Sequence, residues 1–268
     1  MAINAIVREP PSGVELDVLD LAVPHKNERP IQPCLGCVST AGGFHCAWSC
    51  TCWGPGSAAA GIPDFMHDAD VYGRLEDADG FIVFTPIHWY SVPTQLKAMF
   101  DRLVCANLTI TRAVAVALFG GGSATAEHMS TGDDTLPPSI KDPKLTKQAQ
   151  RSGRYDHYLK NHLEGKVAGF FVHGDAGADD YIRNKRPASY LAAPKEREPG
   201  HRCAIQPLVW QCRYSGIFVP DDCVETFDIN QNVPYADQND KARANVSFAD
   251  RAGMLLDRVV NHIKLRSM

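Results

Sequence analysis

Five cysteine side chains, which can serve as metal ligands or redox groups, lie in one short stretch of the chain. They are spaced as C-x2-C-x8-C-x3-C-x-C, at Cys34, Cys37, Cys46, Cys50 and Cys52. Two thiolates at C-x2-C can share one metal ion, and the later three could complete a zinc site or an iron–sulfur cluster. Because the spacing fits no standard zinc finger, reduced structural or redox thiols are the favoured interpretation.

A second group of chemically capable side chains follows a short apolar run, FIVF at 81–84. Thr85 and Pro86 lead there directly to His88, Trp89 and Tyr90. Proline restricts the backbone at the turn, and an indole ring can stack on a planar heterocycle. The alternative is that the aromatic rings only cover the end of a sheet or a subunit interface. The pattern favours a surface that receives a flat ligand.

The elements that would position these groups alternate between short apolar runs and amphipathic stretches. Such alternation predicts an open parallel α/β sheet flanked by helices. Strands are expected at 13–21, 81–84, 167–172 and 216–220. Helices are expected at 64–76, from Ser91 to about Val104, around 205–212, and at 240–264.

The chain is long enough to form one large domain over residues 1–268. Residues 30–63 are rich in cysteine, glycine and proline and predict a long functional loop. Residues 107–163 fit the alternating pattern poorly and are interpreted as an insertion.

Composition narrows the classes of function. Among the 268 residues, 27 are basic and 31 are acidic, with a formal net charge of -4, which disfavours nucleic acid or an anionic membrane as a partner. No run of apolar residues is long enough to span a membrane and no export signal is visible, so a cytoplasmic protein with small-molecule partners is expected. The motifs of common hydrolases, nucleotide triphosphatases and Rossmann dehydrogenases are absent.

The strand-end segment TPIHWYSVPTQLKAMFDRL at 85–103 resembles the signature of the flavodoxin-like NADPH-dependent FMN reductases. CLGCVST at 34–40, CAWSCTC at 46–52 and KVAGFFVHGDAGA at 166–178 are also similar to this family, which is related to iron–sulfur flavoproteins and quinone reductases. The resemblance implies a flavodoxin-like fold and contacts with the FMN ring from two strand-end loops. The implied contact residues are Thr85, Pro86, Ile87, His88, Trp89, Gly174 and Asp175.

One part of the family pattern is not visible. The chain is expected to lack the first strand and the loop that wraps the FMN phosphate at a helix N-terminus. A glycine-rich turn later in the chain, with Gly120, Gly122 and Thr125, is an alternative candidate for binding the phosphate, although a flexible turn within the insertion is the favoured interpretation. His173 and Asp175 could also form an acid–base pair, although a histidine at a strand end is often only a satisfied polar group.

The resemblance implies an oxidoreductase that binds FMN, uses NAD(P)H to reduce it, and passes electrons to a quinone, a flavin or another small acceptor. In that chemistry the cofactor carries the reaction, so no catalytic residue is assigned. A homo-oligomer is also implied. Two alternatives stay open: a non-catalytic binding or assembly subunit, and an iron–sulfur or flavin electron carrier that uses the Cys34–Cys52 loop.

Overall fold

The computed structural model describes about half of the chain as an α/β unit. The described residues are 10–21, 30–36, 46–50, 52–54, 61–88, 91–111, 151–153, 156–174, 200–228 and 246–267, with the single positions 6, 59 and 148. Expectations for other residues, including the glycine-rich turn at 120–125, lie outside this part of the chain.

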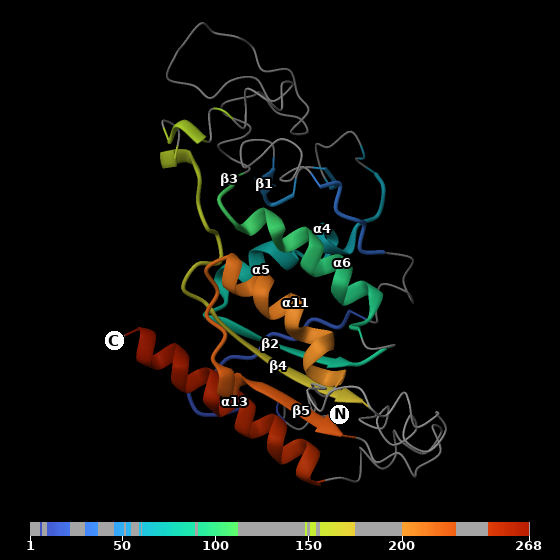
Figure 1. The fold of residues 1–268 in the computed structure, drawn as a ribbon, viewed down its shortest axis with the longest axis vertical. Coiled ribbons are helices and arrows are strands. Elements are labelled where there is room, and N and C mark those ends of the chain that lie inside the picture. The colour runs from blue at the N-terminus through green and yellow to red at the C-terminus, as the bar shows by residue number, and fades with distance from the viewer. Residues whose placement is uncertain are drawn as a thin grey trace, which may run out of the picture.

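The central sheet has three parallel strands in the order β2-β4-β5, which span Gly80–Pro86, Val167–Gly174 and Val224–Asp228 (Figure 1). Two shorter strands, β1 (Ala47–Trp48) and β3 (Ile110–Thr111), pair in parallel to form a second small sheet. The strands predicted at 81–84 and 167–172 are therefore confirmed. The parallel arrangement with flanking helices confirms the expected α/β fold.

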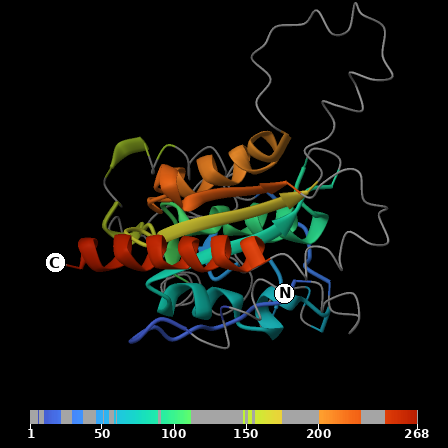
Figure 2. The ribbon, with the colours of Figure 1, turned by 90° about the horizontal axis from the view of Figure 1, so that it is seen from below.

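Helices cover both faces of the central sheet. Side chains along β4 point alternately to one face and to the other. Ala168, Phe170 and Val172 pack into the core beneath α6 (Thr94–Arg102) and α11 (Gly200–Tyr214). Val167 and Phe171 face the opposite way, toward α13 (Val246–Arg266). Because both faces of β4 are buried, its sequence is a continuous apolar run. Figure 2 shows α13 as one layer and α11 as another, with the strands between them.

The remaining helical elements are short. They are α4 (Phe65–Asp68), α5 (Val71–Asp77) and the 3-10 turns Leu103–Ala106, Asp156–Tyr158 and Asp221–Cys223. The helices expected after Ser91, around 205–212 and near the C-terminus are all present. No helix in the described part of the chain is long and apolar enough to cross a membrane.

The single helix expected at 64–76 is divided in two by Asp70. This residue has a left-handed backbone with φ 47°, which ends α4, and its carboxylate accepts a hydrogen bond from the Gly73 N–H at 3.2 Å. The side chain therefore caps α5. An aspartate that satisfies helix N–H groups competes with continuation of the preceding helix, which explains why a continuous helix was the wrong prediction.

Two predicted strands are not strands of the structure. Residues 13–21 run without a ladder partner in the described chain, and the Val18 carbonyl accepts a hydrogen bond from the Arg74 side chain at 2.8 Å instead. Residues 216–220 contribute only an isolated bridge between Phe218 and Val167, while the strand itself begins later, at Val224. Alternation and apolar runs do not specify a pairing partner, which depends on the assembled sheet. The absence of the family's first strand stays a prediction.

The expected insertion has closely spaced ends. Thr109 and Lys160 exchange two backbone hydrogen bonds, at 3.1 and 3.0 Å, and the Leu108 N–H donates to Asn161 Oδ1 at 2.9 Å. His162 then donates its backbone N–H to the Ala106 carbonyl at 2.8 Å. The chain thus returns after residue 156 to the point it left near residue 109.

Packing between β4 and α13 provides the first stability prediction. A methyl group on Gly169 would lie 2.7 Å from Val259 Cγ2, which is itself buried. We expect Gly169→Ala to lower the free energy of unfolding by about 1–3 kcal/mol, measured by urea denaturation, because the packed interface cannot accept the extra volume. Gly253 of α13 has open space around it. The matched change Gly253→Ala should instead raise stability by about 0.5–1 kcal/mol, and a loss of the same size in both variants would contradict the packing argument.

Candidate functional site

The carboxyl ends of the three central strands lie level with one another. Pro86 of β2 is the register partner of His173 of β4, and His173 is the partner of Phe227 of β5. Beyond this row the Ile87 N–H donates to the His173 carbonyl at 3.0 Å. Ligands of open parallel sheets bind at this edge, where strand-end loops converge. We call the group Pro86, Ile87, His88, His173 and Gly174 the strand-end site.

The end of β2 and the loop after it contain most of the predicted contact residues. Thr85 is 2% exposed and its hydroxyl donates to the Pro86 carbonyl at 3.0 Å, so this side chain is turned into the protein. Pro86 and Ile87 are half-buried, and His88 is exposed. His88 and Ser91 exchange backbone hydrogen bonds of 2.8 and 3.0 Å, which close a tight turn. Trp89 lies outside the described residues.

The end of β4 meets the loop after β2 directly. A Cβ atom on Gly174 would approach the Ile87 Cβ to 3.3 Å, so the absence of a side chain there allows the close approach. The His173 ring contacts Phe248 of α13 edge to face, with 5.7 Å between ring centroids. Asp175 lies outside the described residues, so its pairing with His173 stays a prediction.

The sheet register adds one position that the sequence did not indicate. Asp228, the last residue of β5, is the register partner of Gly174. It therefore ends the third strand at the same edge as the predicted loops. The sequence analysis did not identify Asp228 as a strand-end residue because it expected the strand at 216–220, whereas β5 spans 224–228.

The structure also reveals a buried ion pair beside the cysteine-rich segment. Arg102, the last residue of α6, donates from Nη1 to Asp64 Oδ1 at 2.5 Å, and the side chains are 0% and 1% exposed. The guanidinium also lies 5.8 Å from the centroid of the Tyr72 ring. Among the described residues, Arg102 Nε and Nη2, Asp64 Oδ2 and the Tyr72 hydroxyl make no hydrogen bond. Arg102 lies within the family-like segment at 85–103. Its place three positions after the apolar Met99, on the buried face of the expected helix, was the sequence signal for a buried charge.

Cys50 lies within reach of this positive charge. A hydrogen bond from the Cys52 thiol and the charge of Arg102 lower the pKa of Cys50 to about 6, although burial opposes the shift. His67 Nε2 lies 2.9 Å from the Cys50 carbonyl oxygen and holds the same segment to α4. This setting favours the thiolate form of Cys50 more than the surroundings of an ordinary cysteine do.

The remaining cysteines differ in environment. Cys46 and Cys50 are buried, whereas Cys34 and Cys52 are half-buried. Within the described chain, no three of them place their sulfur atoms within 4.8 Å of one another. Cys37 lies outside the described residues. A preassembled metal site in this segment is therefore not found among the four described thiols.

The low pKa of Cys50 can be tested by ultraviolet titration of thiolate absorbance in the native protein. We expect an absorbance step with a midpoint near pH 6 that disappears in Cys50→Ala. Burial raises the pKa of Cys212 to about 12, so Cys212→Ala should leave this step unchanged.

The low pKa of Cys50 also predicts how stability depends on pH. Because the folded protein releases the Cys50 proton at about pH 6 and an ordinary thiol does so near pH 9, the contribution of Cys50 to stability should grow as pH rises from about 6 to 9. A first step near the ordinary thiol value would contradict this account.

Parallel strands with helices on both faces and a site at the strand ends define a flavodoxin-like α/β protein. The model of the family described as NADPH-dependent FMN reductase matches residues 2–131, so this part of the chain is similar to that family. The match includes the strand-end loop after β2 as well as the cysteine-rich segment.

A curated relative gives a shorter match. The chain is similar to the "Iron-sulfur flavoprotein" of Methanosarcina thermophila, with 40% identity over 73 residues. The aligned part covers 26% of this chain and 37% of the relative, so the chain spans little more than a third of that protein. No solved structure matches the chain significantly.

Proposed function

We propose that this protein binds FMN at the strand-end site and uses NAD(P)H to reduce it, with a small molecule such as a quinone or a flavin as the electron acceptor. The observation that carries the proposal is the direct contact between the loop after β2 and the end of β4, where the Ile87 N–H donates to the His173 carbonyl at 3.0 Å. The family match to residues 2–131 supports the same conclusion.

The residues of the strand-end site suit one face of a flat ring. Pro86 and Ile87 offer half-buried apolar surface, Gly174 allows the close approach of Ile87, and His88 adds an exposed polar group. The N–H groups of Ile87 and His88 already bond to protein carbonyls. Donors to the polar edge of a ring would therefore come from the chain after His88. The phosphate part of the site falls outside the described residues.

When bound, FMN would supply the hydride and electron transfer, and the chain supplies position and a partly water-excluded surface. Pro86 restricts the backbone where β2 ends, and the hydrogen bond from Ile87 to His173 holds the loop after β2 against the end of β4. Neither role requires a protein group to gain or lose a proton. We therefore assign binding residues and no catalytic residue.

The decisive experiment is the absorption spectrum of the purified protein before and after incubation with FMN. We expect flavin bands that persist through gel filtration, and oxidation of NADH or NADPH that depends on an added quinone or flavin. A colourless protein that takes up no FMN would contradict the proposal and would favour a non-catalytic binding or assembly subunit.

We also propose that the protein is a homo-oligomer. Light scattering on the same sample measures its molar mass in solution, and Trp210 and Tyr214, exposed on α11, are candidate contacts between copies.

A second candidate function is electron transfer through an iron–sulfur cluster in the cysteine-rich segment. The partial match to an iron–sulfur flavoprotein favours it. No three of the described thiols have sulfur atoms within 4.8 Å, which disfavours a single metal ion held by these thiols but does not test a cluster, whose cysteine ligands bind different iron atoms. Iron and acid-labile sulfide analysis of anaerobically purified protein separates the two candidates, since only the second requires both elements.

A further inference from the structure

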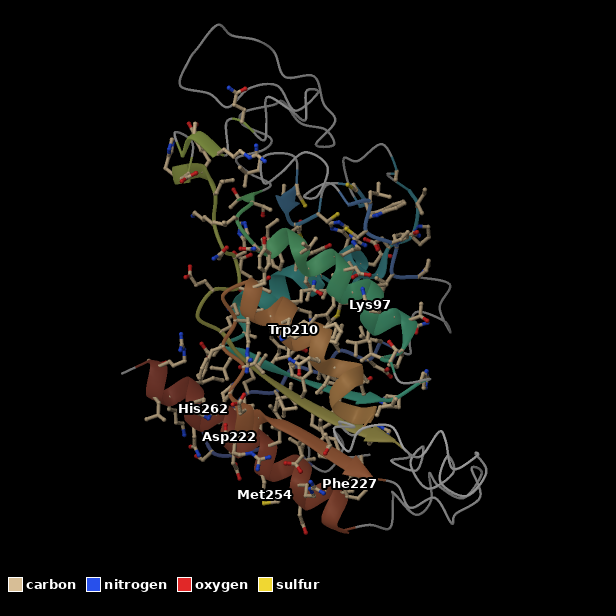
Figure 3. All side chains as sticks on the ribbon, in the orientation of Figure 1. Lys97, Trp210, Asp222, Phe227, Met254 and His262 are labelled. Carbon is tan, nitrogen blue, oxygen red and sulfur yellow. The ribbon has the colours of Figure 1, made fainter. Side chains whose placement is uncertain are left out.

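Three residues of the types that bind metal ions meet near the amino end of β5, at the end of the sheet opposite to the strand-end site. Asp222 and Cys223 form the turn that leads into β5, and His262 comes from the last part of α13. One ligand atom from each residue lies within 4.8 Å of the other two. His262 Nε2 is 3.0 Å from Asp222 Oδ1 and 3.3 Å from Oδ2. Figure 3 shows His262 and Asp222 beside one another where α13 passes the start of β5.

The three side chains differ in exposure in a way that suits a site open on one side. Cys223 is fully buried, whereas the side chains of His262 and Asp222 are 27% and 56% exposed. The His262 ring is held by an edge-to-face contact with Phe218, with 5.8 Å between ring centroids. An ion could therefore enter from solvent over Asp222 while the sulfur and the imidazole approach from the protein side.

The surrounding charges are partly neutralised. The positive charge of Arg258 lies close enough to Cys223 to act on its thiol. Arg258 is already paired, because its Nη2 donates to Glu225 Oε2 at 2.7 Å. Arg266 lies over the Phe218 ring, 4.9 Å from its centroid. His262 also belongs to the C-terminal part of a long helix, where the unpaired carbonyl groups favour positive charge. An unpaired Arg258 therefore does not stand beside these three side chains to repel a cation.

We propose that Asp222, Cys223 and His262 bind a zinc ion that links α13 to the start of β5, with water as the fourth ligand. A set of thiolate, imidazole and carboxylate suits zinc and disfavours magnesium or calcium, which prefer oxygen ligands alone. Ligand atoms around a tetrahedral zinc ion lie roughly 3.3–3.6 Å apart. Small side-chain rotations from the present arrangement would suffice, and the hydrogen bond between His262 and Asp222 would be exchanged for two metal bonds.

The test uses the full chain after treatment with a chelator, titrated with Zn²⁺ against a competing indicator and with Co²⁺ as a coloured substitute. We expect one ion to bind with the visible absorption of tetrahedral cobalt and a sulfur-to-cobalt charge-transfer band. His262→Gln and Asp222→Asn should each weaken binding by at least about 100-fold, since loss of mere supporting residues around metal sites already costs about 10–100-fold. Both positions are near the surface, so these variants should remain folded, as circular dichroism will show.

Controls separate this site from the cysteine-rich segment. His157→Gln removes an imidazole elsewhere in the described chain and should leave binding unchanged, and Cys50→Ser should do the same. Zinc should also raise the melting temperature of the wild-type protein and not that of His262→Gln. Failure of the wild type to bind Zn²⁺, or equal binding by His262→Gln, would overturn the proposal. FMN uptake should be equal in all of these proteins, so the result does not depend on the proposed flavin function.

Discussion

Replacing Asp64 with asparagine should lower the free energy of unfolding by about 3–5 kcal/mol. Asp64 and Arg102 are 1% and 0% exposed and lie 2.5 Å apart, so the substitution leaves the buried guanidinium without the carboxylate that pairs with it. Asparagine keeps the size of the side chain and can still accept the hydrogen bond that the Gln32 N–H donates to Asp64 Oδ1. The loss therefore reports on charge and not on volume. Urea denaturation of both proteins measures it.

The matched control is the exposed ion pair between Asp17 and Arg74. Its closest atoms are also 2.5 Å apart, but the Asp17 side chain is 65% exposed. We expect Asp17→Asn to cost less than about 1 kcal/mol because water screens and solvates the remaining charge. Equal losses in the two variants would show that burial does not determine the contribution of the Asp64 pair.

A double variant separates the charge from the surrounding packing. Because removing both buried charges avoids an uncompensated ion, Asp64→Leu combined with Arg102→Met should be more stable than Asp64→Asn alone. The same double variant should raise the pKa of Cys50, since it removes the positive charge that attracts its thiolate. The ultraviolet titration described above would detect the shift.

Replacing Trp89 with alanine should weaken FMN binding about 10- to 100-fold, which corresponds to the loss of one stacking contact between an aromatic side chain and a planar ring. In the sequence Trp89 directly follows His88, whose backbone exchanges two hydrogen bonds with that of Ser91. Truncation at this position should leave those bonds intact. We therefore expect little change in the free energy of unfolding, measured alongside the FMN titration.

Trp210→Ala is the matched control for this variant. Trp210 is 63% exposed on α11 and belongs to neither strand-end loop. Its removal should leave FMN affinity unchanged while altering the protein's intrinsic fluorescence in a similar way. An FMN affinity that is the same in Trp89→Ala and the wild type would show that the indole ring only packs against protein.

Several elements could be predicted from local pattern because their sequence repeats match the geometry of the element. The apolar run of β4 reflects burial on both faces, and the helical spacing of Leu96, Met99 and Phe100 reflects the single buried face of α6. Such patterns arise within a few residues and need no knowledge of distant neighbours. They placed the strand-end loop after β2 correctly at the carboxyl edge of the sheet.

Other features depended on residues far apart in the chain. The third strand begins at Val224 and not at 216 because pairing with β4 selects the register, which no local repeat encodes. The helix break at Asp70 depends on one left-handed residue whose carboxylate caps the next helix. A single polar residue of this kind is common in continuous helices, so its effect could not be foreseen.

By itself the sequence determined the class of this protein, an α/β sheet with a loop of aromatic and apolar residues at a strand end, because strand and helix periods and a compact motif are local properties. Only the tertiary structure decided which distant groups meet. It joined Asp64 to Arg102 beside Cys50, and it brought His262 of α13 to the turn before β5. Such encounters follow from how helices pack on the sheet, and contacts across many intervening residues leave no periodic trace along the chain.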